Sequence, residues 1–176
     1  MEHNAFTRRA NAVMSEIRTE AGLFLVSTGQ AVVPSNIEKF EAIWDTGATN
    51  TAASSAVIAK LGSQPITFTH IATGGGIVTA PVHLLNIVLP NNVIIPNITV
   101  TELKDLNSCD VLIGMNVITR GDFALTHVDG KTCFSFRMPS HKPIDFVPES
   151  NRHNLKLQRT RNRTAQAKAK SSKKRK

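Results

Sequence analysis

Short apolar runs and turn-forming residues alternate along most of the chain. Between residues 23 and 138 the apolar runs are interrupted by glycine, proline and asparagine, as in strands joined by tight turns. Apolar and polar positions alternate in Ile98–Val100 and in Phe134–Met138, which is typical of strands that bury one face. The pattern predicts an all-β domain with hairpin turns at Asn91-Asn92 and Asp129-Gly130.

Two short helices are predicted within this β pattern. The first runs from Ser55 to Leu61, where the apolar positions share one side of a helix. Ser54 or Ser55 can cap its first turn, and Gly62 fits the left-handed position after its last turn. A second helix of one or two turns is predicted near Met115–Thr119.

The two ends of the chain differ from the part between them. Residues 1–21 form an N-terminal extension, and the roughly helical spacing of apolar residues in 5–20 leaves two readings, a short amphipathic helix or a frayed terminus. Residues 22–140 form the folded domain, and 141–151 form a proline-containing linker. Residues 152–176 lack aromatic residues and cannot bury enough apolar surface, so a disordered tail is predicted there.

Positive charge is concentrated in that tail. The chain carries a net charge of +8, yet residues 152–176 hold 11 of its 21 basic residues and no acid. Residues 1–151 therefore hold 10 basic and 13 acidic residues, a net charge of −3. The tail could bind nucleic acid or another polyanion without sequence preference, could act as a nuclear address in a eukaryote, or could simply be solvated.

Several classes of protein are not expected. No apolar run approaches the about 18 residues of a membrane span. The N-terminus carries acids and bases throughout, without the apolar core of a secretory signal. A cytoplasmic protein with no membrane association is therefore predicted. The six histidines and the two cysteines lack the spacing of metal ligands, so no metal and no cofactor are predicted.

The strongest chemical signal is an acid placed at the end of an apolar strand. Phe40–Trp44 runs directly into Asp45, Thr46 and Gly47. A carboxylate in that position is costly unless it is hydrogen-bonded or paired, glycine permits a tight turn, and threonine can hydrogen-bond the neighbouring backbone. An isolated Asp-Thr-Gly triplet is more often a solvated turn. Here apolar residues precede the triplet, and Ala48–Thr51 and a predicted helix follow it. This context resembles the active-site loop of retropepsin-like aspartic peptidases, which implies a catalytic role for Asp45.

Two further motifs follow in order. Thr73–Ile77 is a glycine-rich tip between two β-like runs. It is either a simple flexible turn or, as its likeness to the flap of the same family implies, a segment that closes over bound peptide. A phosphate-binding loop is disfavoured because neither a Lys-Ser/Thr pair nor a helix follows it. Asp110–Asn116 is an apolar strand that ends in Gly114 and leads into the second predicted helix.

Together, from Leu23 to about Thr126, these three motifs resemble the retropepsin-like aspartic peptidases. The added hairpin Phe123–Arg137 resembles the ending of small cellular and bacterial-type members of that family. The resemblance implies an all-β, retropepsin-like closed β-barrel or sandwich with one or two short helices. It also implies an aspartic endopeptidase.

The family mechanism needs two carboxylates that share a proton over one water molecule. Because this chain has a single Asp-Thr-Gly, the resemblance implies a homodimer in which Asp45 meets Asp45 of a second subunit. Thr46 would brace the two loops, and the backbone of Gly47 and Ala48 would hold the substrate. The substrate-binding flap would comprise Thr73, Gly74, Gly75 and Gly76.

The chain departs from the retroviral pattern in three places. Thr49 and Asn50 stand where retroviral enzymes often have acids, and Met115 stands where they often have an arginine that supports the dimer. The chain also continues into the Asp129-Gly130 hairpin, whereas a viral subunit ends soon after its helix. The arginine contact of the viral dimers is therefore missing here, and the resemblance does not carry over the outer substrate contacts or the mode of dimerisation.

Two other functions remain open beside an active peptidase. One is a catalytically inactive retropepsin-like module that binds peptides or dimerises, since a fold does not guarantee activity. The other is a nucleic-acid-associated protein in which residues 152–176 carry the function. Cleavage of peptides that depends on Asp45 would favour the peptidase over both.

Overall fold

The computed structural model describes residues 3–26, 34–35, 37–73, 76–106 and 108–173. The chain divides into two units, residues 1–141 and residues 142–176. The predicted tips Gly74 and Gly75 of the flap lie outside the described residues.

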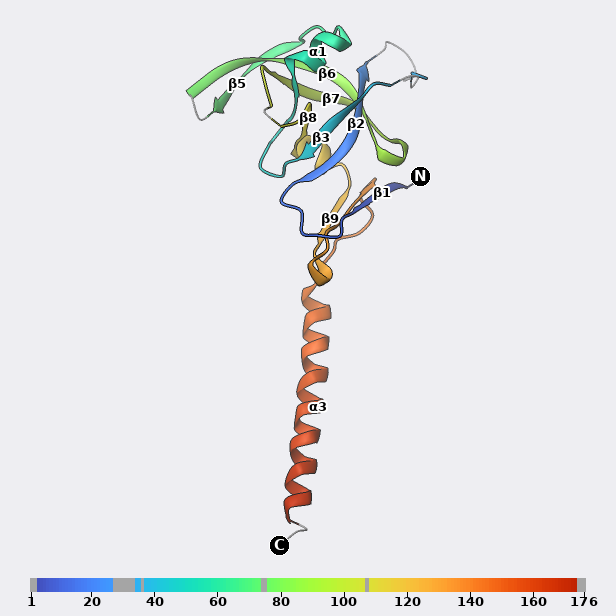
Figure 1. Ribbon diagram of the computed structural model, residues 1–176, viewed down its shortest axis with the longest axis vertical. Helices are drawn as coiled ribbons and strands as arrows, with labels where there is room; N and C mark the ends of the chain where they lie inside the picture. The colour runs from blue at the N-terminus through green and yellow to red at the C-terminus, as the bar shows by residue number, and fades with distance from the viewer. Residues whose placement is uncertain (1–2, 27–33, 36, 74–75, 107, 174–176) are drawn as a thin grey trace. The chain divides into compact units, whose positions relative to one another are not determined.

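The first unit is built on a seven-stranded sheet in the order β2-β3-β8-β4-β7-β6-β5 (Figure 1). Its strands are β2 (Ile17–Leu25), β3 (Lys39–Trp44), β4 (Thr51–Ser54), β5 (Thr67–Thr73), β6 (Gly76–Leu89), β7 (Val93–Leu103) and β8 (Val111–Ile113). Strand β2 also pairs with β6, which closes six strands into a barrel and leaves β5 as an outer strand paired only with β6. The predicted all-β barrel is confirmed.

The strand order determines where the predicted catalytic loop lies. Strand β8 is parallel to β3 on one side and antiparallel to β4 on the other. The chain between β3 and β4 must therefore cross over the end of β8. This crossing brings residues 45–50 onto the start of the segment that follows Ile113.

The N-terminus is a strand pair and not a helix, so the helical interpretation of residues 5–20 is wrong. Strand β1 (Asn4–Arg9) pairs with β10 (Cys133–Met138), and β10 pairs with β9 (Asp122–Thr126) in a second sheet. Phe6 is 9% exposed and packs on Phe134. The pairing joins residues more than 120 positions apart, and such a partner overrides local spacing.

The two predicted helices and both predicted turns are confirmed. Helix α1 (Ser55–Leu61) is capped by the Ser54 hydroxyl and ends at Gly62, whose φ is 66°. Helix α2 is Met115–Ile118. The turns η1 (Pro90–Asn92) and η2 (Val128–Gly130) join the β6–β7 and β9–β10 pairs.

The second unit contains helix α3 (Val147–Lys173). The sequence predicted a linker up to residue 151 and a disordered tail from residue 152. For the positions that lie in α3, both predictions are wrong. Alanine, arginine, lysine and glutamine have high helix propensity, which does not require a buried face. The side chains of residues 147–165 are exposed, and no helix in the described part of the chain is long and apolar enough to cross a membrane.

Candidate active site

Asp45 lies at the end of β3, directly after the buried Trp44. Its backbone N–H donates to the carbonyl of Ile113 at 2.9 Å, which extends the parallel pairing of β3 with β8 by one residue. Its carboxylate is half-buried. The strand pairing therefore fixes the backbone of the acid while its side chain keeps access to solvent.

A tight turn after Asp45 holds its carboxylate. The backbone N–H of Gly47 donates to Asp45 Oδ1 at 2.8 Å, and the N–H of Ala48 donates to the Asp45 carbonyl at 3.3 Å. A β-carbon on residue 47 would lie 3.2 Å from that carboxylate oxygen. Glycine at this position allows the backbone to approach the acid closely.

The start of helix α2 is hydrogen-bonded to the loop that follows Asp45. The N–H groups of Met115 and Asn116 donate to the carbonyls of Ala48 and Thr49, at 2.8 and 3.1 Å. These donors belong to the first turn of α2, where helix N–H groups have no partner within the helix. The N–H groups at the start of α2 and the carbonyl groups of the loop thus become hydrogen-bond partners.

Asn116 also connects helix α2 to strands β4 and β7, and the sequence analysis missed this role. Its side-chain oxygen accepts from the N–H and the hydroxyl of Thr51, at 2.9 and 2.8 Å. Its amide nitrogen donates to the carbonyl of Thr99 at 2.9 Å. Thr51 is fully buried, and its hydroxyl oxygen accepts from the N–H of Gly114 at 3.2 Å. The available signal was an asparagine two residues after the strand-ending glycine.

A groove of about 580 Å³ opens beside Asp45. The loop that carries Asp45 forms one wall, and β5 and β7 contribute others. Asp45 is the only acid among its described lining residues, which are Asp45, Gly47, Ala48, Thr49, Asn50, Ala52, Thr69, His70, Ile71, Ala72, Thr101, Leu103 and Leu112. The described residues of this chain therefore offer a single carboxylate to this groove.

The predicted hairpin next to the groove is present. Strands β5 and β6 pair from Thr67 with Val82 up to Thr73 with Gly76. Gly76 has a φ of 117°, a backbone conformation that favours glycine. Of the predicted substrate-binding residues, Gly47 and Ala48 line the groove, and Thr73 and Gly76 lie at the ends of the hairpin strands.

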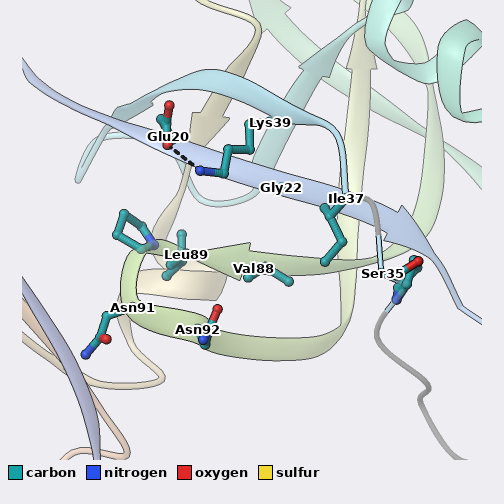
Figure 2. Close-up of a pocket in the computed structure, with 11 residues that line it drawn as sticks. Glu20, Gly22, Ser35, Ile37, Lys39, Val88, Leu89, Asn91 and Asn92 are labelled. Carbon is teal, nitrogen blue, oxygen red and sulfur yellow. Dashed lines mark hydrogen bonds and ion pairs between the residues drawn. The ribbon is translucent and has the colours of Figure 1, made fainter.

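A second hollow of about 340 Å³ shares no lining residue with this groove. Figure 2 shows it between β2 and the turn that joins β6 to β7. Glu20 and Lys39 are its only charged lining residues among those described, and they pair with each other at 3.0 Å. The hollow therefore lacks an unpaired carboxylate. No group of three or more potential metal ligands occurs within the described residues.

Comparison with known proteins identifies similar sequences and structures. The model of a family described as "gag-polyprotein putative aspartyl protease" matches residues 33–120, half of the chain. The crystal structure of a retropepsin-like aspartic protease from Rickettsia conorii is 17% identical, and the match covers 78% of this chain and 96% of that one with a TM-score of 0.50. This likeness shows a shared fold.

A second similar structure is viral. The solution structure of simian foamy virus (mac) protease is 20% identical, and the match covers 58% of this chain and 91% of that one with a TM-score of 0.40. No curated protein matches the chain.

Proposed function

The chain belongs to the family of gag-polyprotein aspartyl proteases with a retropepsin-like fold, and on this premise we propose that it is an aspartic endopeptidase. The observation that carries the proposal is the placement of Asp45. Its carboxylate lies on a rigid loop, accepts a backbone N–H, and opens onto a groove large enough for several peptide side chains. Gly47 allows the tight turn of this loop, and Thr46 would support the loop in the active form.

The active form would be a homodimer. The groove of one subunit contains one carboxylate, whereas activation of water by this mechanism needs two. The Thr46 side chain is exposed, and its hydroxyl has no hydrogen bond to another described residue. A two-fold axis beside the loop would bring Asp45 against Asp45 and leave each Thr46 free to bond the opposite loop.

The two carboxylates would divide the chemistry between them. Like charges about 3 Å apart cannot both ionise easily, so the pair retains one proton. The ionised member takes a proton from the water that attacks the peptide carbonyl carbon, and the protonated member donates to the carbonyl oxygen. The carboxyl that received the water proton then gives it to the amine nitrogen as the C–N bond breaks, and the other carboxylate takes back a proton from a hydroxyl of the intermediate as the carbonyl re-forms.

The groove supports an extended peptide with uncharged side chains. Apart from Asp45 and His70, the described residues that line it carry no ionisable side chain. Strand β5 lies at the edge of the seven-stranded sheet and lines the groove. A peptide could therefore add to this region as a further strand, with alternate side chains in the pockets. The backbone of Gly47 and Ala48 and the hairpin at Thr73–Gly76 would hold it.

A proteolysis assay tests this function. We expect the wild-type chain to cleave members of a peptide library between about pH 4 and 7, because the pair must keep one proton. Asp45→Asn and a pepstatin-like inhibitor should each abolish cleavage. Asp129→Asn is the matched control, because Asp129 is exposed in the η2 turn with a φ of 52°, a conformation asparagine tolerates.

The outcomes separate the candidate functions. Cleavage that survives Asp45→Asn, or a chain that stays monomeric at every concentration, would contradict the proposal. Peptide binding without cleavage at any pH would support an inactive peptide-binding module.

Helix α3 favours nucleic-acid binding as a second function. Arg152, Lys156, Arg159 and Arg163 are spaced by four, three and four residues, so they share one side of the helix, and their side chains are exposed. No acid follows Glu149. A mixed-sequence DNA duplex should bind the whole chain, with affinity that falls steeply as salt rises. It should not bind a chain that ends at residue 151, and equal binding by both chains would exclude this function.

A further inference from the structure

His83 is a buried histidine that the proposed catalytic chemistry does not use. Its side chain is 1% exposed and lies on β6. Its Nδ1 lies 3.0 Å from Ser63 Oγ, and its Nε2 lies 3.1 Å from Glu102 Oε2. One ring therefore joins the segment after α1, strand β6 and strand β7.

The hydrogen bonds use both nitrogens of the ring. The Glu102 carboxylate can only accept, so Nε2–H donates to it, and Nδ1 forms the second hydrogen bond with the Ser63 hydroxyl. Both nitrogens of the buried ring therefore have a partner.

The set lies where the β5–β6 hairpin leaves the barrel. The first bond of the hairpin runs from the Ile66 N–H to the Val82 carbonyl at 2.8 Å. At the same point, the pairing of β6 with β7 ends at Val82 and Thr101. His83 is the next residue on β6, and Ser63 lies three residues before Ile66. Both strands of the hairpin therefore start from residues beside this ring.

Each partner of His83 is itself held in place. The N–H of Ser63 donates to the Ile58 carbonyl at 3.4 Å, and Gly62 adopts the left-handed conformation, as in a standard helix C-terminus. Glu102 lies on β7 between Thr101 and Leu103, which line the groove. The ring thus connects the end of α1 to the strand that forms a groove wall.

We propose that Ser63, His83 and Glu102 form a hinge clamp that positions the β5–β6 hairpin beside the groove. They are positioning residues, and their effect on substrate rests on the proposed peptidase function. Loss of the Ser63 hydroxyl would leave a buried ring nitrogen without its hydrogen-bond partner, which is unfavourable. Local opening of the hairpin should then become more frequent, because opening exposes that nitrogen to water.

Hydrogen exchange of the whole chain tests the clamp without requiring catalysis. In Ser63→Ala, exchange of residues 66–72 should accelerate by roughly five- to a hundredfold, while the barrel strands exchange as in the wild type. Ser63→Thr restores a hydroxyl and should restore protection. Ser55→Ala is the matched control, because it removes a serine bond to the Leu103 carbonyl at the other end of α1.

Peptide hydrolysis supplies the second readout. Ser63→Ala should raise KM severalfold and leave kcat within about twofold, because the reacting carboxylates are untouched. Ser63 lies in a partly exposed loop, so this variant should fold, unlike a truncation of the buried His83.

The two proposals can fail separately. Faster exchange of the hairpin in a chain that cleaves no peptide would support the clamp and overturn the peptidase function. Cleavage by the wild type, with hairpin exchange and KM unchanged in Ser63→Ala, would overturn the clamp and leave the peptidase function standing.

Discussion

The backbone of Gly114 packs directly against the carbonyl group of Asn50. A β-carbon on residue 114 would come within 2.5 Å of the carbonyl carbon and oxygen of Asn50, and within 2.9 Å of the carbonyl oxygen of Ala48. These neighbours are backbone atoms of the loop that carries Asp45. They cannot move aside without moving the loop, so the spacing between β8 and the loop requires glycine.

Gly114→Ala should therefore displace the Asp45 loop and destabilise the first unit. Overpacking of this kind costs about 1–3 kcal/mol or more, and peptidase activity should fall further than stability. Urea unfolding and kcat/KM measure the two effects. Gly130→Asn is the control, because Gly130 has open space around its β-carbon position and a φ of 71° that asparagine tolerates. Full activity of Gly114→Ala would contradict this account of the loop.

Asn116→Ala should loosen the same loop from its other side. The substitution removes the acceptor for the N–H and hydroxyl of Thr51, which is buried. Each buried group left unpaired costs about 1–3 kcal/mol. The midpoint of urea unfolding should therefore shift to a lower urea concentration, and kcat should fall. The exposed Asn154→Ala in α3 serves as the control. An unchanged midpoint would show that water replaces the lost bonds.

Local signals made parts of this fold predictable from sequence. The cap at Ser54 and the left-handed Gly62 determine the two ends of α1 through contacts within a few residues. Asn91 and Asp129 have positive φ values of 57° and 52°, which asparagine and aspartate adopt more readily than most residues. In these places the chemistry of a single residue determines the local backbone conformation.

Contacts between distant segments were not predictable in this way. Phe6 fits a helical spacing with its neighbours, yet it is buried because β1 pairs with β10 at the far end of the unit. The Asn116 network likewise joins β4, β7 and α2, and the His83 clamp joins three separate segments. The Asp45 motif was recognisable, whereas the side chains that position its surroundings were visible only in the folded chain.

Phe134→Ala should be the most destabilising of these substitutions. Phe134 is fully buried, and its ring centre lies 5.0 Å from that of Trp44, the residue before Asp45. Truncation of a buried phenylalanine costs about 3–5 kcal/mol. Phe146→Ala should cost little, because Phe146 is 63% exposed. Urea unfolding compares the two, and equal midpoints would show that the second sheet does not stabilise the barrel.

Asp122 connects the end of the first unit to β9 and β10. Its Oδ1 accepts from the Ser140 hydroxyl at 2.6 Å, and its Oδ2 accepts from the Arg137 guanidinium and from the His141 N–H. The Ser140 hydroxyl, followed by Arg137 and the His141 N–H, holds the pKa of the Asp122 carboxyl well below its ordinary value. Folding therefore favours the ionised form.

The direction of this pKa shift determines how stability depends on pH. A carboxyl whose pKa is lower in the folded chain stabilises it fully above the unfolded pKa of about 3.9, and this stabilisation is lost as the pH falls further. Asp122→Asn should therefore lower the urea midpoint by the same amount at pH 7 and pH 5, and by less at pH 3. The exposed Asp129→Asn should change little at any of these values. A difference between wild type and Asp122→Asn that grew on acidification would mean that the folded carboxyl prefers its proton, and the bonds from Ser140 and Arg137 could not be those described.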